Sequence, residues 1–457
     1  MTEPTALAIE QNGTPAPVSL WVAFRFWLKL GFISFGGPAG QIAIMHQELV
    51  ERRRWISERR FLHALNYCML LPGPEAQQLA TYIGWLMHRN IGGILAGALF
   101  VLPSLFILIG LSWLYMAYGE VTWVAGVFYG IKPAVTAIVA QAAHRIGGRA
   151  LTNKLLWAIA AAAFVAIFAF NIPFPLIVLA AGILGFWGGR TAPQYFSGRS
   201  GHGAGGKSYG PALIDDDTPS PAHARFSWRQ LTTIAAVGAL LWLLPMGLLL
   251  ASQGWGGTLT QMAWFFTKAA LLTIGGAYAV LPYVYQGAVG TYGWLTPTQM
   301  IDGLALGETT PGPLIMVVAF VAFVGGFGKL VFGPEAAFLS GAVAAILVTW
   351  FTFLPSFIFI LAGGPLVEST HGELKFTAPL TAITAAVVGV ILNLALFFAY
   401  HVLWPLGFAG SMDLASLLIA ASAALALFKF KRSVIQVLII SAIAGLAVKL
   451  FAIPTLI

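Results

Sequence analysis

Charged residues are scarce in this chain of 457 residues, in which Asp, Glu, Lys and Arg together make up 9% of the sequence. A typical soluble domain carries about 25% charged residues, and so few charges could not keep the surface of a soluble fold of this size hydrated. Hydrophobic residues make up 59%. The composition excludes an ordinary soluble protein and predicts a membrane protein.

Cysteine is almost absent, because Cys68 is the only one in the chain. A single thiol cannot form a disulfide framework or a thiolate metal cluster. His46, His63, His88 and His144 lie near the ends of apolar runs, with no two at ligand spacing on one helix. No clustered nucleophile or carboxylate pair is apparent either, so we expect no metal, no cofactor, no redox chemistry and no enzymatic reaction.

Nucleotide and nucleic-acid binding are not expected, although two features could suggest them. GHGAGGKS (Gly201–Ser208) fits the Walker A pattern, but it lies in the short polar segment 188–230 and not between a buried strand and a helix. The net charge of +8 comes mostly from basic residues in short loops beside apolar runs, where the positive-inside rule places them.

Long apolar runs are abundant. Most reach the length of about 20 residues that crosses roughly 30 Å of hydrocarbon as a helix. No Lys or Arg precedes Arg25, so the chain lacks the basic start of a cleaved signal peptide, and the first run is expected to be retained. We predict an all-α polytopic membrane protein with about twelve apolar runs. These are 20–45, 66–87, 92–118, 121–143, 155–187, 231–251, 262–285, 304–328, 336–363, 378–400, 411–428 and 434–457.

The chain contains an internal repeat. WLK (27–29) before SFGGPAG matches FTK (266–268) before TIGGAYA, at an offset of 268 − 29 = 239 residues. The same offset relates Trp55 to Trp294 and relates the two Pro-Gly-Pro motifs to each other. Later, LPSLF (102–106) matches LPSFI (354–358) at an offset of 252. Transporters are commonly built from two such halves, with the substrate bound between them.

Composition and charge divide the chain into four predicted parts. These are an N-terminal tail (1–19), a first membrane repeat (20–187), a flexible cytoplasmic linker rich in Gly, Ser and Pro (188–230) and a second membrane repeat (231–457). The stretch 51–60 holds five arginines, whereas its counterpart 290–299 holds no charge. By the positive-inside rule the two loops lie on opposite sides of the membrane, which predicts inverted repeats with broken or re-entrant segments at the Gly-Gly and Pro-Gly-Pro motifs.

The two Pro-Gly-Pro motifs, 72–74 and 311–313, are the candidate substrate site. Proline breaks an incoming helix and suits the first turn of an outgoing one. If Pro74 and Pro313 begin half-helices, the free N–H groups of 75–77 and 314–316 form positive helix ends that suit an anion. A proline kink in an ordinary membrane helix is the alternative for either motif alone, and its occurrence twice in register favours the site.

Two matching lysines and two glycine pairs are further candidates. Lys29 and Lys268 each lie seven residues before a glycine pair, 36–37 or 275–276. A lysine near the middle of the membrane costs roughly 2.5–3.5 kcal/mol, so a retained one tends to pair or to line a cavity, although one near a helix end can snorkel to the surface. The glycines would let backbone approach a ligand or simply a neighbouring helix.

Glu75 and Glu308 flank the two Pro-Gly-Pro motifs on opposite sides, so they are not equivalent under the repeat. A carboxylate beside an anion site repels the substrate unless it takes up a proton. Pairing with a lysine or arginine is the alternative role, and the sequence leaves both open.

Three segments resemble the chromate transporter family in its long, two-domain form. They are FGGPAGQIAIMHQELVERRRWISERRF (35–61), LPGPEAQQLATYIGW (71–85) and TTPGPL (309–314), and the resemblance covers nearly the whole chain from about Leu20. The second glycine pair is followed by Ala277, where the first is followed by Pro38, so the halves need not contact substrate alike. By position, the family's features map to Gly36, Gly37, Pro38, Arg54, Trp55, Pro72, Gly73, Pro74, Glu75, Gln78, Gly275, Gly276, Pro311, Gly312 and Pro313.

The resemblance implies a secondary transporter that exports chromate across a bacterial cytoplasmic membrane and confers chromate resistance. A carrier for sulfate or another oxyanion, with chromate as a passenger, is the main alternative, and a membrane scaffold without transport is a remote one. The expected partners are the oxyanion and the bilayer, with no nucleic acid, and homodimerisation is left open. The candidate substrate-binding residues are Lys29, Gly36, Gly37, Pro72, Gly73, Pro74, Glu75, Ala76, Gln77, Gln78, Lys268, Gly275, Gly276, Glu308, Thr309, Thr310, Pro311, Gly312, Pro313 and Leu314.

Overall fold

The structure is a computed structural model that describes residues 15–35, 37–196, 209–219, 221–274, 276–369 and 377–451. Its regular elements in these ranges are helices, and extended pairing is limited to isolated bridges such as the one between Ile56 and Ile214. The prediction of an all-α fold is confirmed.

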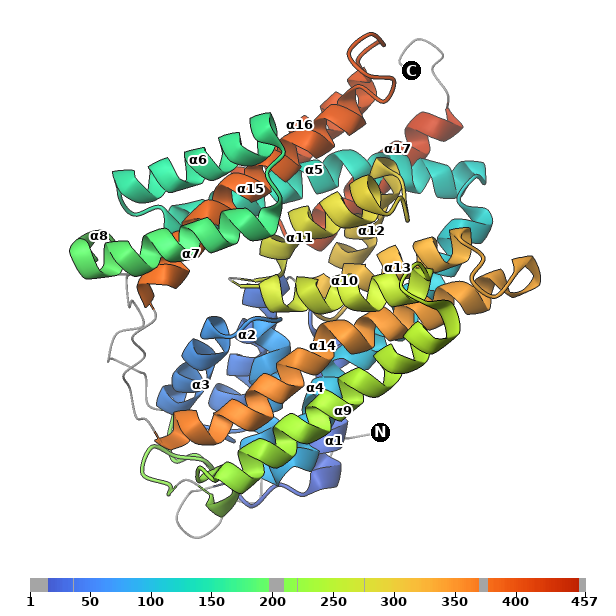
Figure 1. Ribbon diagram of the computed structural model, residues 1–457. Coiled ribbons are helices and arrows are strands. Elements are labelled where there is room, and N and C mark those ends of the chain that lie inside the picture. The colour runs from blue at the N-terminus through green and yellow to red at the C-terminus, as the bar shows by residue number, and fades with distance from the viewer. Residues whose placement is uncertain are drawn as a thin grey trace.

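The helices follow one another along the chain as Figure 1 labels them. The first part comprises α1 (Leu20–Ile33), α2 (Gly37–His46), η1 (Gln47–Arg52), α3 (Glu58–Leu70), α4 (Glu75–Tyr118), α5 (Thr122–Ala150), α6 (Lys154–Phe170), α7 (Phe174–Thr191) and α8 (Pro193–Phe196). Next come η2 (Ala222–Ala224) and α9 (Trp228–Gln253). The last part comprises α10 (Thr258–Leu272), α11 (Ala277–Tyr285), η3 (Gln286–Thr291), α12 (Pro297–Thr309), η4 (Leu314–Met316), α13 (Val317–Gly328), η5 (Pro334–Ala336), α14 (Ala337–Ser369), α15 (Thr377–Leu403), α16 (Leu414–Phe428) and α17 (Val434–Leu450).

Six of the described helices are long and apolar enough to cross a membrane. One of them is α9, in which only 11% of the apolar window is buried inside the protein. Its Leu240 and Leu248 are 60% and 63% exposed. Apolar surface of this extent is stable against hydrocarbon rather than water. The chain is a multi-pass membrane protein.

Several of the predicted apolar runs contain two helices each. The run 155–187 divides into α6 and α7, because Asn171 adopts a left-handed conformation (φ 49°) and Pro173 is the N-cap of α7. Proline has no N–H with which to continue the preceding helix. The runs that contain a Gly-Gly or Pro-Gly-Pro motif are also divided there, as predicted.

The second repeat follows the first element by element. The π-helical turns η1 and η3 begin at Gln47 and Gln286, and 286 − 47 = 239 is the offset found in the sequence. α4 bends sharply at His88 and Arg89, and the second repeat has the separate helices α13 and α14 at that point. α9 has no equivalent in the first repeat, because α10 corresponds to α1.

The arm of α4 after its bend (90–118) runs antiparallel to α14, and the two helices lie side by side (Figure 1). Near the bend, a Cβ at Gly364 would meet the Trp85 ring, whereas at the other end the rings of Trp113 and Phe338 are 6.1 Å apart. This arm of 29 residues is about 43 Å long. Its two ends therefore mark the two faces of the molecule.

The equivalent loops of the two repeats lie at opposite ends of this arm. At the bend, Arg60 of α3 is 3.0 Å from Glu368 of α14 and Tyr82 donates a hydrogen bond of 2.6 Å to Glu368. We call these three residues the linker-face cluster. At the other end, Asp302 of α12 accepts a hydrogen bond of 2.8 Å from Tyr115.

Lys132 of α5 completes this second group, with its Nζ 3.4 Å from Asp302 Oδ2. We call Tyr115, Lys132 and Asp302 the opposite-face cluster. Each cluster joins the helix before one Pro-Gly-Pro motif to a helix of the other repeat. Because α3 and α12 are equivalent and their clusters lie on opposite faces, the contacts agree with the predicted inverted arrangement.

One part of the segment predicted as a flexible linker packs against the first repeat. The N–H groups of Leu213 and Ile214 donate to the carbonyl oxygens of Arg54 and Trp55 at 2.9 and 3.0 Å. Residues 209–219 are therefore held against the arginine-rich loop 51–60. The Walker-A-like segment 201–208 lies outside the described residues.

Small residues bring the helices of the two repeats into close contact. A Cβ on Gly130 of α5 would lie 1.9 Å from the carbonyl oxygen of Ser441 and 2.8 Å from Gly445 Cα, both on α17. Such close backbone packing is how membrane helices associate, because lipid provides no hydrophobic drive between them.

We expect Gly130→Ala to lower the melting temperature of the purified protein in detergent, because the added methyl group overpacks the contact with α17 at a cost of about 1–3 kcal/mol. Gly148→Ala is the matched control on the same helix, where the added Cβ meets nothing within 4 Å. That change should be neutral or stabilising by up to about 1 kcal/mol through helix propensity. Equal melting temperatures for the two variants would contradict the described packing of α5 on α17.

Candidate functional site

The two repeats exchange a pair of backbone hydrogen bonds at the Pro-Gly-Pro motifs. The N–H of Gly73 donates to the carbonyl oxygen of Thr273 at 2.7 Å, and the N–H of Gly312 donates to the carbonyl oxygen of Ser34 at 2.8 Å. Since 312 − 73 and 273 − 34 both equal 239, the two bonds are equivalent under the repeat. We call this region the crossing. It joins the break of each repeat to the other repeat.

The local sequence explains both partners of these bonds. Ser34 and Thr273 end α1 and α10, where carbonyl groups have no intrahelical partner. Gly73 and Gly312 adopt φ values of +129° and +103°, which residues other than glycine rarely adopt. Each glycine can therefore turn its N–H toward the helix end of the other repeat.

The glycines of the crossing also pack directly against serines. A Cβ on Gly73 would lie 2.3 Å from Ser356 Oγ on α14, and a Cβ on Gly312 would lie 2.7 Å from Ser104 Cβ on α4. The two serines belong to the LPSFI and LPSLF segments and are thus equivalent under the repeat. The crossing therefore brings together three elements of each repeat.

The first Pro-Gly-Pro motif places an uncapped helix end in the crossing. Pro74 is the N-cap of α4 and provides no side-chain hydrogen bond to the first turn, which holds Glu75, Ala76 and Gln77. Gln77 and Gln78 are fully buried, and the Oε1 atom of each has no hydrogen-bond partner. Gln78 Nε2 donates to the carbonyl oxygen of Pro72 at 2.8 Å. Free N–H groups at a helix N-terminus favour an anion.

The second motif differs from the prediction. Pro313 is followed by the short 3-10 turn η4 (Leu314–Met316) rather than directly by an α-helix, and the N–H of Met316 donates to the carbonyl oxygen of Pro313 at 2.9 Å. Met316 is therefore not a free donor, since the tighter turn forms an i to i+3 hydrogen bond. The N–H groups that follow Pro313 are therefore less available to an anion than those that follow Pro74.

Glu75 and Glu308 lie on two sides of the start of α11. Gly276 is the N-cap of α11, and a Cβ built on it would lie 3.9 Å from Glu75 Oε1. Tyr278, two residues further on, donates a hydrogen bond to Glu308 Oε1. The tyrosine hydroxyl thus satisfies one carboxylate oxygen of Glu308.

The structure does not bring Lys29 and Lys268 to the crossing. Lys29 is exposed on α1, and Lys268 lies over the ring of Trp264, which is 39% exposed. Each lysine lies five positions before the residue at the crossing, Ser34 or Thr273. Five positions correspond to a rotation of about 140° around the helix axis, so the lysine and that residue lie on different sides of the helix. The structure therefore does not place the two lysine side chains at the crossing, and long stems allow lysines to extend toward a membrane surface.

The remaining predicted residues are placed as follows. Gly37 starts α2 with φ +68°, and Gly36 and Gly275 lie outside the described residues. The hydroxyl groups of Thr309 and Thr310 donate to carbonyl oxygens of their own helix, α12. The two threonines therefore do not offer free hydroxyl donors at the second motif.

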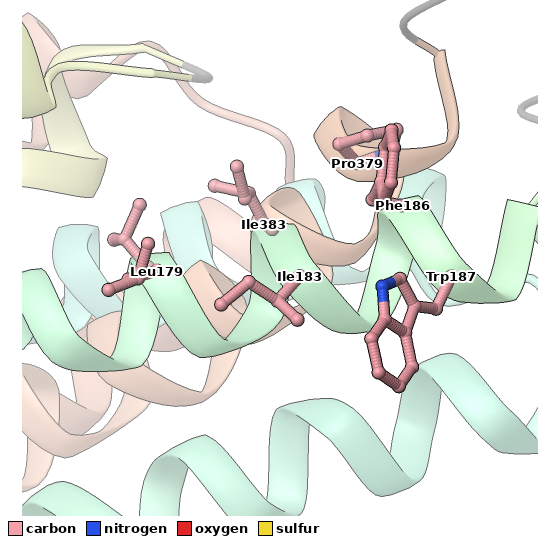
Figure 2. A pocket seen from close by; sticks show the side chains of 8 residues that line it. Leu179, Ile183, Phe186, Trp187, Pro379 and Ile383 are labelled. Carbon is pink, nitrogen blue, oxygen red and sulfur yellow. The ribbon is translucent and has the colours of Figure 1, made fainter.

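An apolar recess lies apart from the crossing. It measures about 410 Å³ and is lined by apolar residues of α7 and α15, including Leu179, Ile183 and Pro379. Figure 2 shows Leu179, Ile183 and Trp187 along α7 beside Pro379 and Ile383 of α15. With Trp187 68% exposed and no charged residue in its lining, this recess suits lipid and not an oxyanion.

Sequence reasoning missed the polar residues that complete the crossing. Ser34 and Thr273 were not singled out, nor was Gln41, whose Nε2 donates to the carbonyl oxygen of Gly312. The paired serines Ser104 and Ser356 entered the sequence argument only as landmarks of the repeat. Their occurrence at equivalent positions, each after a proline, was a signal that could have identified them.

Comparison with known proteins gives consistent results. A family model described as "Chromate transporter" matches residues 21–186 and 260–446, and 260 − 21 = 239 is again the offset of the repeat. A "Chromate transport protein" of Pseudomonas aeruginosa is 34% identical over 387 residues, which cover 83% of this chain and 81% of the relative.

Two other relatives match over a similar length. A "Chromate transport protein" of Cupriavidus metallidurans is 30% identical, covering 89% of this chain and 87% of the relative. A "Probable chromate transport protein" of Synechococcus elongatus is 29% identical, covering 92% of this chain and 93% of the relative. No solved structure matches the chain.

We expect Gly312→Ala to destabilise the protein and to disrupt the crossing. The alanine would have a strained φ of +103°, and its Cβ would lie 2.7 Å from Ser104 Cβ. Backbone strain and overpacking each cost about 1–3 kcal/mol. Gly110→Ala on α4 is the control, since its Cβ would meet nothing within 4 Å. A melting temperature of Gly312→Ala in detergent that matched the control would show that this turn is not packed as described.

Proposed function

Because the chain belongs to the chromate transporter family, we propose that it exports chromate, a tetrahedral oxyanion, from the cytoplasm and so confers chromate resistance. The proposed membrane is the bacterial cytoplasmic membrane. The names of the relatives from Pseudomonas aeruginosa and Cupriavidus metallidurans support chromate as the substrate. Sulfate or another oxyanion of the same shape and charge is the alternative.

The observation that carries the proposal is the crossing, where broken helices of two inverted repeats meet. Substrate sites of secondary transporters lie at repeat interfaces and are formed by such half-helices, whose N-termini point at anionic groups. Here the start of α4 lies at the crossing, and no side chain caps the N–H groups of its first turn. We propose that the N–H groups of Glu75, Ala76 and Gln77 replace part of the hydration shell of the oxyanion.

Membrane potential alone can supply the driving force. An inside-negative potential acts on a dianion with about 2 × 2.3 kcal/mol per 100 mV in the outward direction. ATP is therefore not needed for export. No chemical step on the substrate is involved in this proposal.

We propose that the linker face is cytoplasmic. The loop 51–60 on that face carries five arginines, and its equivalent on the opposite face carries no charge. The positive-inside rule orients short loops in this way. The docked linker segment 209–219 would then lie in the cytoplasm together with this loop.

Alternating access would separate the two clusters in turn. The linker-face cluster and the opposite-face cluster each join the two repeats, at the two ends of the arm of α4. If one repeat rocks against the other, a path from the cytoplasm needs the Arg60–Glu368 contact to open. A path to the outside needs the Lys132–Asp302 contact to open.

We expect everted membrane vesicles that contain this chain to take up labelled chromate when the lumen is made positive, and to take up little without a potential. Sulfate should compete weakly. Vesicles without the chain are the control. Stronger uptake of labelled sulfate than of chromate would favour the alternative substrate, and no flux of either ion would remove the substrate assignment.

Cross-linking should show whether both clusters must open. In a Cys68→Ala background, the pair Lys132→Cys and Asp302→Cys, or the pair Arg60→Cys and Glu368→Cys, is bridged by a short bifunctional methanethiosulfonate, which forms a reducible disulfide with each thiol. Either bridge should lower chromate uptake at least tenfold, and reduction should restore it. The four single-cysteine variants control for the reagent. Full uptake with either bridge in place would exclude rocking of the repeats at that face.

A further inference from the structure

Ser104 and Ser356 share an unusual state. They are 0% and 1% exposed, and neither Oγ atom has a hydrogen-bond partner. They lie at equivalent positions of α4 and α14, directly after Pro103 and Pro355. A buried hydroxyl group without a partner costs about 1–3 kcal/mol, so two at equivalent positions call for an explanation.

Some other buried hydroxyl groups of this protein are satisfied within their own helix, whereas those of Ser112, Thr260 and Thr352 also lack a partner. Ser34, Thr267 and Thr349 each donate to the carbonyl oxygen four residues earlier, at 2.6, 2.8 and 2.8 Å. A helical serine normally has this bond available. Ser104 and Ser356 do not form it, so their side chains leave the hydroxyl groups free for another partner.

Both free hydroxyl groups border the crossing. Ser356 Oγ would be 2.3 Å from a Cβ on Gly73, and Ser104 Oγ would be 3.1 Å from a Cβ on Gly312. Only the missing side chain of each glycine leaves room beside the hydroxyl. The space next to each serine is therefore bounded by the turn of the other repeat, close to the start of α4 or α13.

We infer that Ser104 and Ser356 bind the transported oxyanion directly, each through its hydroxyl group. This inference rests on the proposed function. A serine hydroxyl is one donor that can rotate toward an anionic oxygen, and a tetrahedral oxyanion presents acceptor oxygens in several directions. Each serine can thus offer one donor to the ion, beside the turn of the other repeat.

This arrangement also explains why the hydroxyl groups stay unsatisfied in the protein alone. A donor already bonded to its own helix would have to break that bond to receive the ion. A free buried donor lowers the stability of the protein when no substrate is bound. It strengthens binding of the oxyanion, because a preorganised donor need not give up another bond first. Hydrogen bonds to charged groups are among the stronger ones in proteins.

The test compares chromate binding and transport by the full-length protein with those of Ser104→Ala and Ser356→Ala. Binding of labelled chromate is measured on protein purified in detergent, and uptake is measured in everted vesicles. Each variant should weaken binding and raise KM about ten- to a hundredfold, the range for losing a hydrogen bond to a charged group. Without chromate, the melting temperature should stay equal or rise, since an unpaired buried hydroxyl has been removed.

Two controls separate binding from packing. Ser112→Ala removes another buried, unpaired hydroxyl from α4, about 12 Å from Ser104 along the helix. Thr349→Val removes a hydroxyl from α14 that is bonded to its own helix. Neither should change KM. Ser104→Cys and Ser356→Cys are a second pair of variants, which keep the size of the side chain with a weaker donor, and they should fall between serine and alanine.

The outcomes distinguish the inference from the proposed function. If the unaltered protein binds and transports chromate but the serine variants keep its KM, the serines do not bind the ion and the proposed function stands. If the alanine variants lose melting temperature as well as binding, the hydroxyl groups have a structural role and the inference is overturned. If the unaltered protein neither binds nor transports chromate, both fall together.

Discussion

The exchanged hydrogen bonds between Gly73 and Thr273 and between Gly312 and Ser34 are the constraint on which the rest of the structure depends. A helix broken inside a membrane leaves N–H and carbonyl groups without water to satisfy them, and each costs several kcal/mol. In this chain each repeat breaks its helices twice, at the glycine pair and at Pro-Gly-Pro. At each break, one of these backbone bonds is made with the other repeat.

This exchange accounts for the surrounding architecture. Because each partner belongs to a different repeat, the repeats must meet with their breaks facing each other, and the long helices α4 and α14 then run antiparallel beside them. Close approach is possible because glycines line the contacts between helices. The polar clusters at Glu368 and Asp302 close the two ends of the same interface.

Part of the candidate site was open to prediction from the sequence, and part was not. The Pro-Gly-Pro motifs were identified because proline and glycine act on the backbone locally, and the repeat showed that both breaks matter. The matching positions of the two lysines do not indicate which side of each helix faces the site, so the sequence could not orient them. Thr273 contacts Gly73, which is 200 residues away along the chain. Ser34 and Gln41 contact Gly312, which is 278 and 271 residues away.

The sequence by itself determined the membrane location, the helical class, the two-fold repeat and the positions of the breaks, because hydrophobic length, backbone chemistry and internal similarity are local properties that can be read along the chain. The tertiary structure alone decided which groups meet at the crossing. Rotation of each helix about its axis turned Lys29 outward and left Ser104 beside Gly312, and that rotation is set by packing between the two repeats.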